Sequence, residues 1–584
     1  MVDLTNDCLY EIFNNYLKKY PRQLFTCLLV NRQWCSIIVP ILWSKSTKHC
    51  NDKRLMKIYL LSLNEKEKAP LNQLNIPFPN DSKPLINYTS YTTYVNNSDL
   101  KKGITNYLHR DKYESNYDKN DEIYEIFNED KVAKVVEYSL ITMLARTSKK
   151  IKYFSFNEIT SNRLVKILEN FLYKSTTLTT LIFNHIEFSF QAIKALANIL
   201  RKNGSLDSLT LHYCTLRCSE YCVWIRYRHD CEEEGCDEEC EESGDEISDL
   251  YYNDHRCVEL KTLTDALFEN TSLSTLSLRD NIFCDDIAEE EFEKDLYRNK
   301  TLASFNLAAD VISFKSAKVF AEFLYNNISL TSLNLYNIRL FDFEGFKAMA
   351  ETISRNNVLT SLALVNCGIG LEGVKAIAEV LCKNILTSLD LRGDNIGFEE
   401  AKILTEALRE NTTLTSLSLS LSENGENTTL TSSNHSLREN STLTSLNLSL
   451  RDNTTLTSLS LCNNQLGTEG VKVLAEILSV NYTLTSLTLG GEIKIDGIKA
   501  LSETLYTNTT LTSLSLCGNF LNQVFEAVKI LTDALCKNTT LTDLTLYNNK
   551  LTVKEGELLA DFLCQNTALT SLNLKDNQLG YLGP

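Results

Sequence analysis

A six-residue leucine pattern, Leu-Thr-Ser-Leu-x-Leu or a near variant, returns along most of the chain, and its spacing restricts the fold more than any other feature. Copies begin at Ile151, Leu178, Leu206, Leu273, Leu302, Leu330, Leu359, Leu386, Leu414, Leu443, Leu456, Leu484, Leu511, Leu541 and Leu569. Twelve of the fourteen intervals lie within two residues of 28. A fixed period of about 20–50 residues is typical of repeat proteins, in which each repeat completes its core against its neighbours.

Each repeat contains two apolar patterns of different period. Leu514 and Leu516 are two residues apart, as on one side of a strand, and Gly518-Asn519 follows as a turn. A helical spacing of three and four residues comes next, as in Val374, Ile377, Ala378 and Leu381. The pattern therefore predicts stacked strand–turn–helix units with a parallel sheet inside and helices outside.

This organisation resembles the leucine-rich repeats of the ribonuclease-inhibitor class, whose units are 28–29 residues long. Residues 456–482 match that pattern most closely, and the resemblance covers residues 151–584. It implies an α/β fold, a right-handed α/β horseshoe of about fifteen units, with a small all-helical domain preceding it.

Two intervals depart from the period. The 67-residue interval after Leu206 includes an acidic, cysteine-containing insertion at about 217–255, with seven cysteines in and beside it. Two interpretations remain for this segment: a zinc-binding site and a solvated acidic loop. The lack of paired CxxC motifs favours the loop. The 13-residue interval, about 443–455, is too short for strand, turn and helix, and predicts a truncated repeat with local instability between about 420 and 455.

The first 45 residues do not follow the repeat. Apolar residues at helical spacing predict three short helices around one small core. These residues resemble an F-box. The first F-box helix is matched by Leu4, Asp7, Cys8, Leu9, Ile12 and Phe13, the third by Val30, Asn31, Arg32 and Trp34, and the C-terminal end of the motif by Leu42-Trp43. Thr5 stands where the family has proline and Asn31 where it has cysteine. The resemblance implies a Skp-family adaptor as partner, contacted by Leu4, Leu9, Ile12, Phe13, Leu28, Val30 and Trp34.

Residues 1–45 could instead form a cap over the first repeat, because the end of a solenoid exposes apolar surface. About a hundred residues separate Trp43 from Ile151, however. The segment 46–150 is expected to be a linker with helices at about 53–64 and 132–147. The second of these is the better candidate for the cap.

No known catalytic or cofactor motif is present. GxxxxGK[ST], GxGxxG, GxSxG and HExxH are all absent. Cys462 and Cys517 share one repeat position and are interpreted as structural residues. We therefore expect a non-enzymatic protein without cofactor, metal or catalytic residues.

The net charge of −17 disfavours nucleic acid as a partner, because phosphate binding needs a basic surface. The N-terminus lacks a secretory signal and no apolar run approaches the roughly 20 residues of a membrane span, so we expect a cytoplasmic or nuclear protein without membrane contact. Asn-x-Ser/Thr sites, as at Asn270, Asn411, Asn481, Asn508 and Asn538, recur at one repeat position. We interpret them as part of the repeat rather than as glycosylation sites.

Together, the F-box resemblance and the repeats imply the substrate-recognition subunit of an SCF-type, cullin-based ubiquitin ligase. The repeats would bind a target protein through the concave side of the sheet. Two alternatives remain: a Ran-type GTPase activator, and an interaction scaffold or immune-type sensor. The expected target-binding residues, one after the leucines of their strands, are Arg279, Tyr336, Arg392, Tyr547 and Lys575.

Overall fold

The computed structural model divides the chain into two compact units, residues 1–302 (unit 1) and 303–584 (unit 2). It describes residues 5–19, 24–74, 86–109, 122–216, 258–283, 299–308, 327–337, 358–421, 453–462, 466–491, 493–519 and 525–580, with a few isolated positions between them. The acidic insertion at 217–255 lies outside the described residues, as does most of the predicted truncated repeat.

Fifteen parallel strands and their helices form an α/β leucine-rich-repeat solenoid, which confirms the predicted fold class. Unit 1 contributes β1 (Tyr94–Asn96), β2 (Tyr153–Asn157), β3 (Thr180–Asn184), β5 (Ser208–His212) and β7 (Thr275–Arg279), in that order. Its short strands β4 (Glu187–Phe188), β6 (Thr215–Leu216) and β8 (Ile282–Phe283) form a second sheet.

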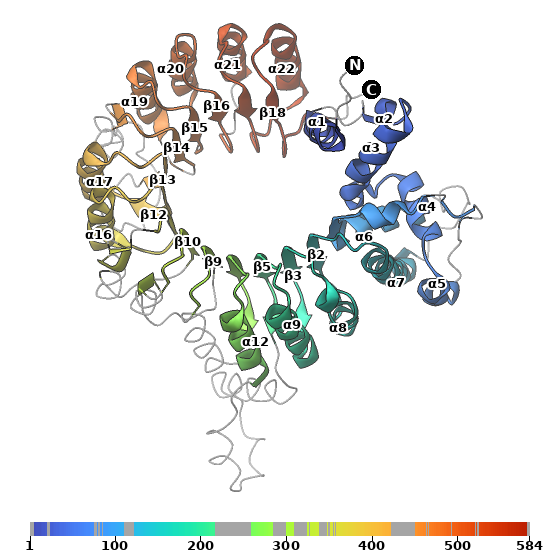
Figure 1. Ribbon diagram of the computed structural model, residues 1–584. Coiled ribbons are helices and arrows are strands. Elements are labelled where there is room, and N and C mark those ends of the chain that lie inside the picture. Colours follow the sequence, from blue (N-terminus) through green and yellow to red (C-terminus); the bar gives the residue numbers. More distant parts are fainter. Residues whose placement is uncertain are drawn as a thin grey trace, which may run out of the picture. The chain divides into compact units, whose positions relative to one another are not determined.

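Unit 2 contributes ten strands that follow one another in chain order (Figure 1). They are β9 (Ser304–Ala308), β10 (Ser332–Tyr336), β11 (Ser361–Val365), β12 (Ser388–Ile396), β13 (Ser416–Leu421), β14 (Ser458–Leu461), β15 (Ser486–Leu489), β16 (Ser513–Ser515), β17 (Asp543–Thr545) and β18 (Ser571–Asn573). Equivalent positions of the leucine pattern pair across them, as Leu333 does with Leu362 and Leu487 with Leu514. The leucines of neighbouring repeats therefore lie side by side in one buried row.

The number of strands agrees with the predicted number of repeats, but the membership differs. Strand β1 pairs with β2 through Tyr94↔Tyr153, although residues 94–96 carry no leucine pattern and were predicted as linker. The pattern at Leu443 falls outside the described residues, and β13 pairs directly with β14 through Ser416↔Ser458. The count of fifteen described strands therefore includes β1, which was not predicted.

Helices cover one face of the strands in each unit (Figure 1). In unit 1 these are α8 (Ser161–Asn170), α9 (Phe190–Lys202) and α12 (Val258–Glu269). In unit 2 they are α16 (Gly370–Cys382), α17 (Phe398–Glu410), α19 (Gly467–Val480), α20 (Ile495–Leu505), α21 (Phe525–Lys537) and α22 (Val553–Gln565). The predicted helical face of α16 is confirmed, because Val374, Ile377, Ala378 and Leu381 are buried.

In most of the described repeats, one asparagine joins the end of the helix to the preceding repeat. The Asn508 side-chain amide donates to the Leu478 carbonyl at 2.9 Å. Its carbonyl oxygen accepts the backbone N–H groups of Thr510 (3.1 Å) and Leu511 (2.8 Å). Asn481, Asn538 and Asn566 make the same three contacts in their own repeats.

The same contacts explain the recurring Asn-x-Ser/Thr motifs. Asn270, Asn411, Asn481, Asn508 and Asn538 are all buried, and each donates its amide to a backbone carbonyl of the preceding repeat. A glycan on that nitrogen would have to displace the neighbouring repeat. The interpretation of these motifs as part of the repeat is confirmed.

A residue with a left-handed backbone conformation follows most of the described strands. In several repeats its N–H donates a hydrogen bond to a carbonyl of the next repeat. Tyr213, with φ of 53°, donates its N–H to the Arg279 carbonyl at 2.8 Å, and Asn548 donates to Lys575 at 3.1 Å. Gly491 occupies this position with φ of 113°, where a Cβ atom would lie 1.9 Å from the Asn464 carbonyl oxygen. Only glycine fits there.

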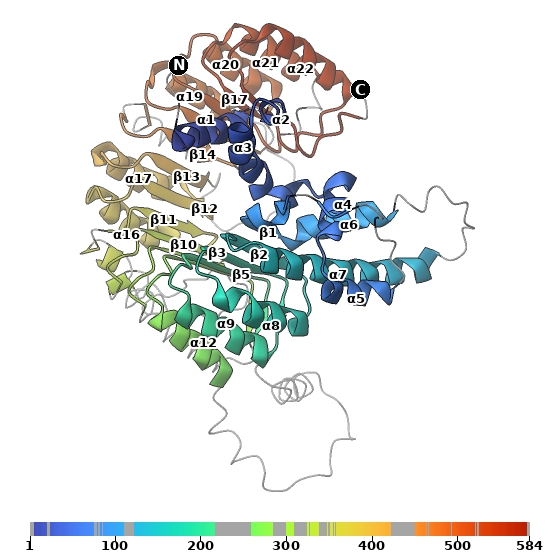
Figure 2. The same cartoon turned by 45° about the vertical axis from the view of Figure 1, so that its right-hand side comes forward.

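The N-terminal region of unit 1 is helical. It contains α1 (Asn6–Lys19), α2 (Leu24–Cys27), α3 (Arg32–Ser44), α4 (Lys53–Leu61), α5 (Glu65–Asn72), α6 (Asn97–His109) and α7 (Glu122–Thr147). Figure 2 shows α6 and α7 next to β1 and β2. The Trp43 ring at the end of α3 stacks on Tyr88 at 4.7 Å, and the Thr93 N–H donates to the Ser44 carbonyl at 2.8 Å. The F-box-like helices therefore pack directly on the segment that leads into the sheet.

A buried carboxyl group joins α7 to the first residue of α6 and, through it, to β2. Glu137 accepts a 2.7 Å hydrogen bond from the Asn97 amide, which also donates to the Asn157 carbonyl at 2.7 Å. Burial raises the pKa of Glu137 to about 7, because removal from water disfavours the charged form. Helix α7, predicted as the better cap, is thus linked to β2 through a group that is half ionised near neutral pH.

Within the described part of the chain, no helix is both long enough and apolar enough to span a bilayer.

Asn508→Ala should destabilise unit 2 by about 1–3 kcal/mol, because the buried Leu478 carbonyl and two N–H groups lose their partner. Thr509→Ala changes an exposed neighbour and should stay within about 0.5 kcal/mol. Urea unfolding followed by circular dichroism measures both. Equal midpoints for the two variants would contradict the role given to the asparagine.

Glu137→Gln should stabilise unit 1 at pH 8 but not at pH 5. The raised pKa means that the protonated carboxyl favours folding at low pH, and that this contribution is lost as pH rises from the unfolded pKa through about 7. Glutamine remains neutral and can still accept from Asn97, so its gain at pH 8 should be on the order of 2 kcal/mol.

Thermal unfolding at pH 5 and pH 8 checks this prediction, with Glu169→Gln on the exposed side of α8 as the control. A gain that does not depend on pH would exclude ionisation of Glu137 as its cause.

Candidate functional site

In the part of the chain that the structure describes, the repeat helices cover one face of the strands, and we call the other face the open face. Along β10 and β15 the leucines are buried, while the residues between and around them are half-buried. Most of these are small polar residues, as in Ser416 and Ser418 of β13. Larger side chains are confined to a few repeats, and these define what the open face can bind.

In unit 1 the large side chains gather around Arg279. Its guanidinium lies 5.5 Å from the ring centroid of Tyr213, which stacks on His185 at 4.7 Å. His212, paired with Arg279 across the strands, lies 2.9 Å from the Ser277 hydroxyl through Nε2. Burial, and then the Arg279 charge, lower the pKa of His212. The group offers a cation and stacked rings, which suit a protein ligand.

In unit 2 Arg392 is fixed by an ion pair within its own strand. Its Nη2 lies 2.7 Å from Oδ2 of Asp390, and its Nε lies 3.0 Å from Oδ1. The guanidinium remains 42% exposed, so it can still contact a ligand. Tyr336, also expected at the target-binding face, is half-buried at the end of β10. Arg392 is therefore a positioned cation rather than a freely moving one.

Tyr547 and Lys575 meet in adjacent repeats. The Lys575 ammonium lies 5.9 Å from the Tyr547 ring centroid. A hydrogen bond with Asp576 raises the pKa of Tyr547. The expected target-binding residues thus form one group at Arg279 in unit 1 and, in unit 2, a Tyr547–Lys575 group and the separately fixed Arg392.

Cys462 and Cys517 form a pair that the sequence interpretation missed. Their sulfur atoms lie 3.7 Å apart, and both residues are half-buried. The hydrogen bond from Cys462 lowers the pKa of Cys517 to about 6 and raises that of Cys462, because one proton is shared between the two. Their shared repeat position indicated a structural role, but it also brings them together.

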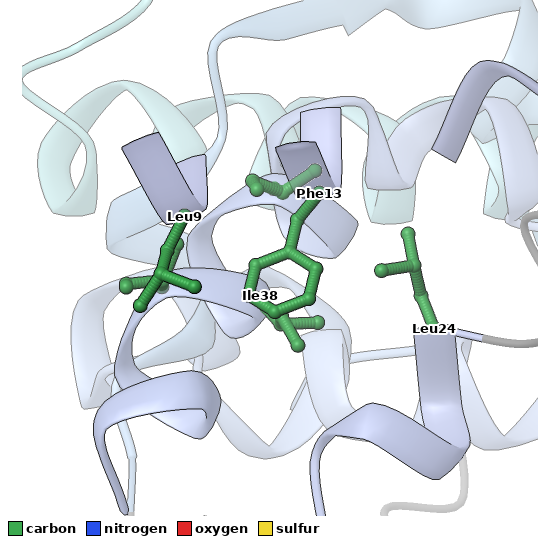
Figure 3. Packing of buried hydrophobic residues seen from close by; sticks show 6 residues of the cluster. Leu9, Phe13, Leu24 and Ile38 are labelled. Carbon is green, nitrogen blue, oxygen red and sulfur yellow. The ribbon is translucent and has the colours of Figure 1, made fainter. Parts of the chain in front are cut away.

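The N-terminal helices close around a small apolar core. Leu9, Phe13, Leu24, Ile37, Ile38 and Ile41 form it, and Figure 3 shows Leu9 and Phe13 directed toward Ile38. The Phe13 ring meets Trp34 edge-on at 4.9 Å. Asn31 stands where the F-box pattern has cysteine. Its side chain caps α3 by accepting the Trp34 N–H at 2.8 Å.

The structure separates the expected adaptor-binding residues into two groups. Leu9 and Phe13 are core residues, and Leu28 and Trp34 pack partly against that core. Ile12 and Val30 are 50% and 57% exposed, and Leu4 lies outside the described residues. Tyr10 and Leu29, the latter 88% exposed, add to the apolar surface. Adaptor contact by Leu9 or Phe13 would therefore require opening the core.

Among the described residues, no group of three or more histidine, cysteine or acidic side chains could hold a metal ion. The cysteines of the insertion, considered above for zinc, lie outside that part of the chain.

The fold and the repeats define a leucine-rich-repeat protein, a class of protein-interaction scaffold. The family model described as "Leucine Rich repeat" matches residues 355–378, 452–475 and 565–583. None of the curated proteins compared with the chain matches it.

Several solved structures are similar to parts of the chain. Leiomodin-1 actin-binding site 2 is 27% identical over 21% of this chain and 70% of its own, with a TM-score of 0.19. LegL7 from Legionella pneumophila, a leucine-rich-repeat-containing protein, is 19% identical over 46% of this chain and 82% of its own (TM-score 0.32). TLR13 in complex with ssRNA13 is 15% identical over 75% of this chain and 58% of its own (TM-score 0.33).

Phe13→Ala should destabilise the N-terminal helices by about 3–5 kcal/mol, because it empties the centre of their core. Ile12→Ala, at the adjacent exposed position, should change stability by about 0.5 kcal/mol at most. Amide hydrogen exchange of α1 and α3 measures both effects. Similar exchange in the two variants would contradict the division into core and surface residues.

Proposed function

We propose that this chain is the substrate-recognition subunit of an SCF-type ubiquitin ligase. The N-terminal helices would bind a Skp-family adaptor, which connects to the cullin, and the open face would bind the target protein. Ubiquitin transfer would then be carried out by other subunits. The chain would contribute by raising the local concentration of target lysines near the charged ubiquitin-conjugating enzyme.

The observation that carries this proposal is an apolar surface beside a completed core. Tyr10, Ile12, Leu29 and Val30 are exposed, although the core of Leu9, Phe13 and Ile38 is closed beneath them. A small helical domain gains nothing in its own stability from four exposed apolar side chains. Such groups are typical of a protein-binding surface.

The surface also agrees with the F-box resemblance. Ile12 belongs to the first matching helix and Val30 to the segment that precedes the third. The turn at Leu28–Val30 is held by backbone bonds from Leu29 to Thr26 and from Val30 to Cys27, both 3.3 Å. Leu29 and Val30 are thus presented on a defined turn, and the α3 cap at Asn31 fixes its end.

Arg279, Tyr336, Arg392, Tyr547 and Lys575 are the proposed target-binding residues. Arg392 and Arg279 each have an acidic neighbour within hydrogen-bonding distance, Asp390 and Asp280. Such pairing reduces the entropy lost when a guanidinium is immobilised by a ligand. Acidic and apolar side chains of a target would fit the Arg279 group of unit 1, and likewise the arginine and tyrosines of unit 2.

Ile12→Asp combined with Val30→Asp should abolish co-purification of the full chain with a Skp-family adaptor. Two carboxylates would have to be desolvated in an apolar interface, which costs far more than the contact provides. Both positions are exposed, so the fold should be retained. Co-expression, affinity capture and quantification of bound adaptor measure the effect, with thermal unfolding as the folding check.

Tyr482→Asp combined with Ile328→Asp is the matched control, because these side chains are 77% and 76% exposed on the repeats. It should bind the adaptor as the wild type does. Failure of the wild type to bind the adaptor, or undiminished binding by the N-terminal double variant, would contradict the proposal.

A further inference from the structure

The half-buried thiols of Cys462 and Cys517 lie on the open face of unit 2. Cys462 follows β14 and Cys517 follows β16, and β15 lies between these two strands. Leu461 pairs with Leu489, so Cys462 is level with Gly490 one position further along. Thr488 pairs with Ser515, so Gly490 is also level with Cys517 two positions further along. Glycine has no side chain to fill the space between the two cysteines. The sulfur atoms therefore approach to 3.7 Å across an intervening strand.

This arrangement does not suit a disulfide bond. Adjacent strands lie about 4.8 Å apart, so residues two strands apart have Cα atoms roughly 9.6 Å from each other. A disulfide needs Cα atoms within about 7 Å. Closing the bond would therefore require the backbone of β14 or β16 to leave the parallel register that Ser458↔Ser486 and Ser486↔Ser513 define.

The sulfur separation does suit a metal ion. A tetrahedral zinc ion with Zn–S bonds of about 2.3 Å holds two thiolates about 3.8 Å apart. We propose that Cys462 and Cys517 form a two-thiolate site for a thiophilic divalent cation, with zinc as its natural occupant, seated over Gly490. Binding replaces the two S–H bonds by two metal–sulfur bonds and releases two protons for each doubly protonated pair.

The surroundings support an open site of this kind. The Ser515 hydroxyl donates to the Cys517 sulfur at 3.6 Å and orients it. Arg392, whose charge acts on Cys462, is already paired with Asp390. Because the chain supplies two ligands here, the other two coordination positions point to the open face. Solvent or a histidine, cysteine or carboxylate of a bound protein would fill them.

The site is independent of adaptor binding and is tested on the full chain. Reduced, metal-free protein is titrated with Zn²⁺ by equilibrium dialysis, and Co²⁺ serves as a probe whose sulfur charge-transfer band reports thiolate ligands. Wild type should bind one equivalent more than Cys462→Ser/Cys517→Ser. Each single serine variant should lose at least about tenfold in affinity for that equivalent. The difference measurement removes any contribution of the remaining cysteines.

Cys536→Ser/Cys564→Ser, which removes two thiols from α21 and α22, is the matched control and should bind as the wild type does. Gly490→Val keeps both thiols but fills the space between them, and it should also lose the equivalent. Thermal unfolding verifies that each variant is folded. Equal stoichiometry in wild type and the Cys462/Cys517 variant, an equal loss in the control, or full binding by Gly490→Val would overturn the proposal.

Discussion

The buried asparagine amide that follows the helix in most of the described repeats is the contact on which the rest of the architecture depends. A leucine row alone could slide along its neighbour, because apolar contacts have no direction. Asn481 and Asn508 bond at once to their own following N–H groups and to a carbonyl of the preceding repeat. The repeats that contain this asparagine are therefore held in register with the ones before them.

That register decides what the open face can do. Once the leucines and asparagines are placed, each remaining strand position has a fixed location on the open face. The side chain at that position then determines what the position can contact. The repeats can therefore vary Ser, Thr, Arg, Tyr or Cys at these positions without disturbing the core. The ion pair of Arg392 with Asp390 and the contact of Lys575 with Tyr547 both arise from side chains at such variable positions.

The repeated part of the fold could be predicted from the sequence because its information is local and recurs. Strand β1 could not, since Tyr94–Asn96 is too short and too polar to suggest a strand, and only pairing with Tyr153 makes it one. The division of the N-terminal apolar residues into core and surface could be predicted only in part for a similar reason. Helical spacing placed Leu9, Ile12 and Phe13 on one apolar stripe, but the position of α3 decides that Phe13 is buried and Ile12 exposed.

The cysteine pair illustrates a kind of site that only the three-dimensional register reveals. Cys462 and Cys517 are 55 residues apart, or two repeats, a distance at which sequence motifs for metal binding are not sought. In a solenoid, however, residues at one repeat position form a row across the sheet, and a glycine in that row brings its two neighbours within reach of each other. Gly490 supplies that gap, and the useful pattern is therefore Cys, Gly, Cys at successive equivalent positions rather than along the chain. A ligand-binding site of this type can arise by single substitutions, because the repeats on either side already hold the backbone in place.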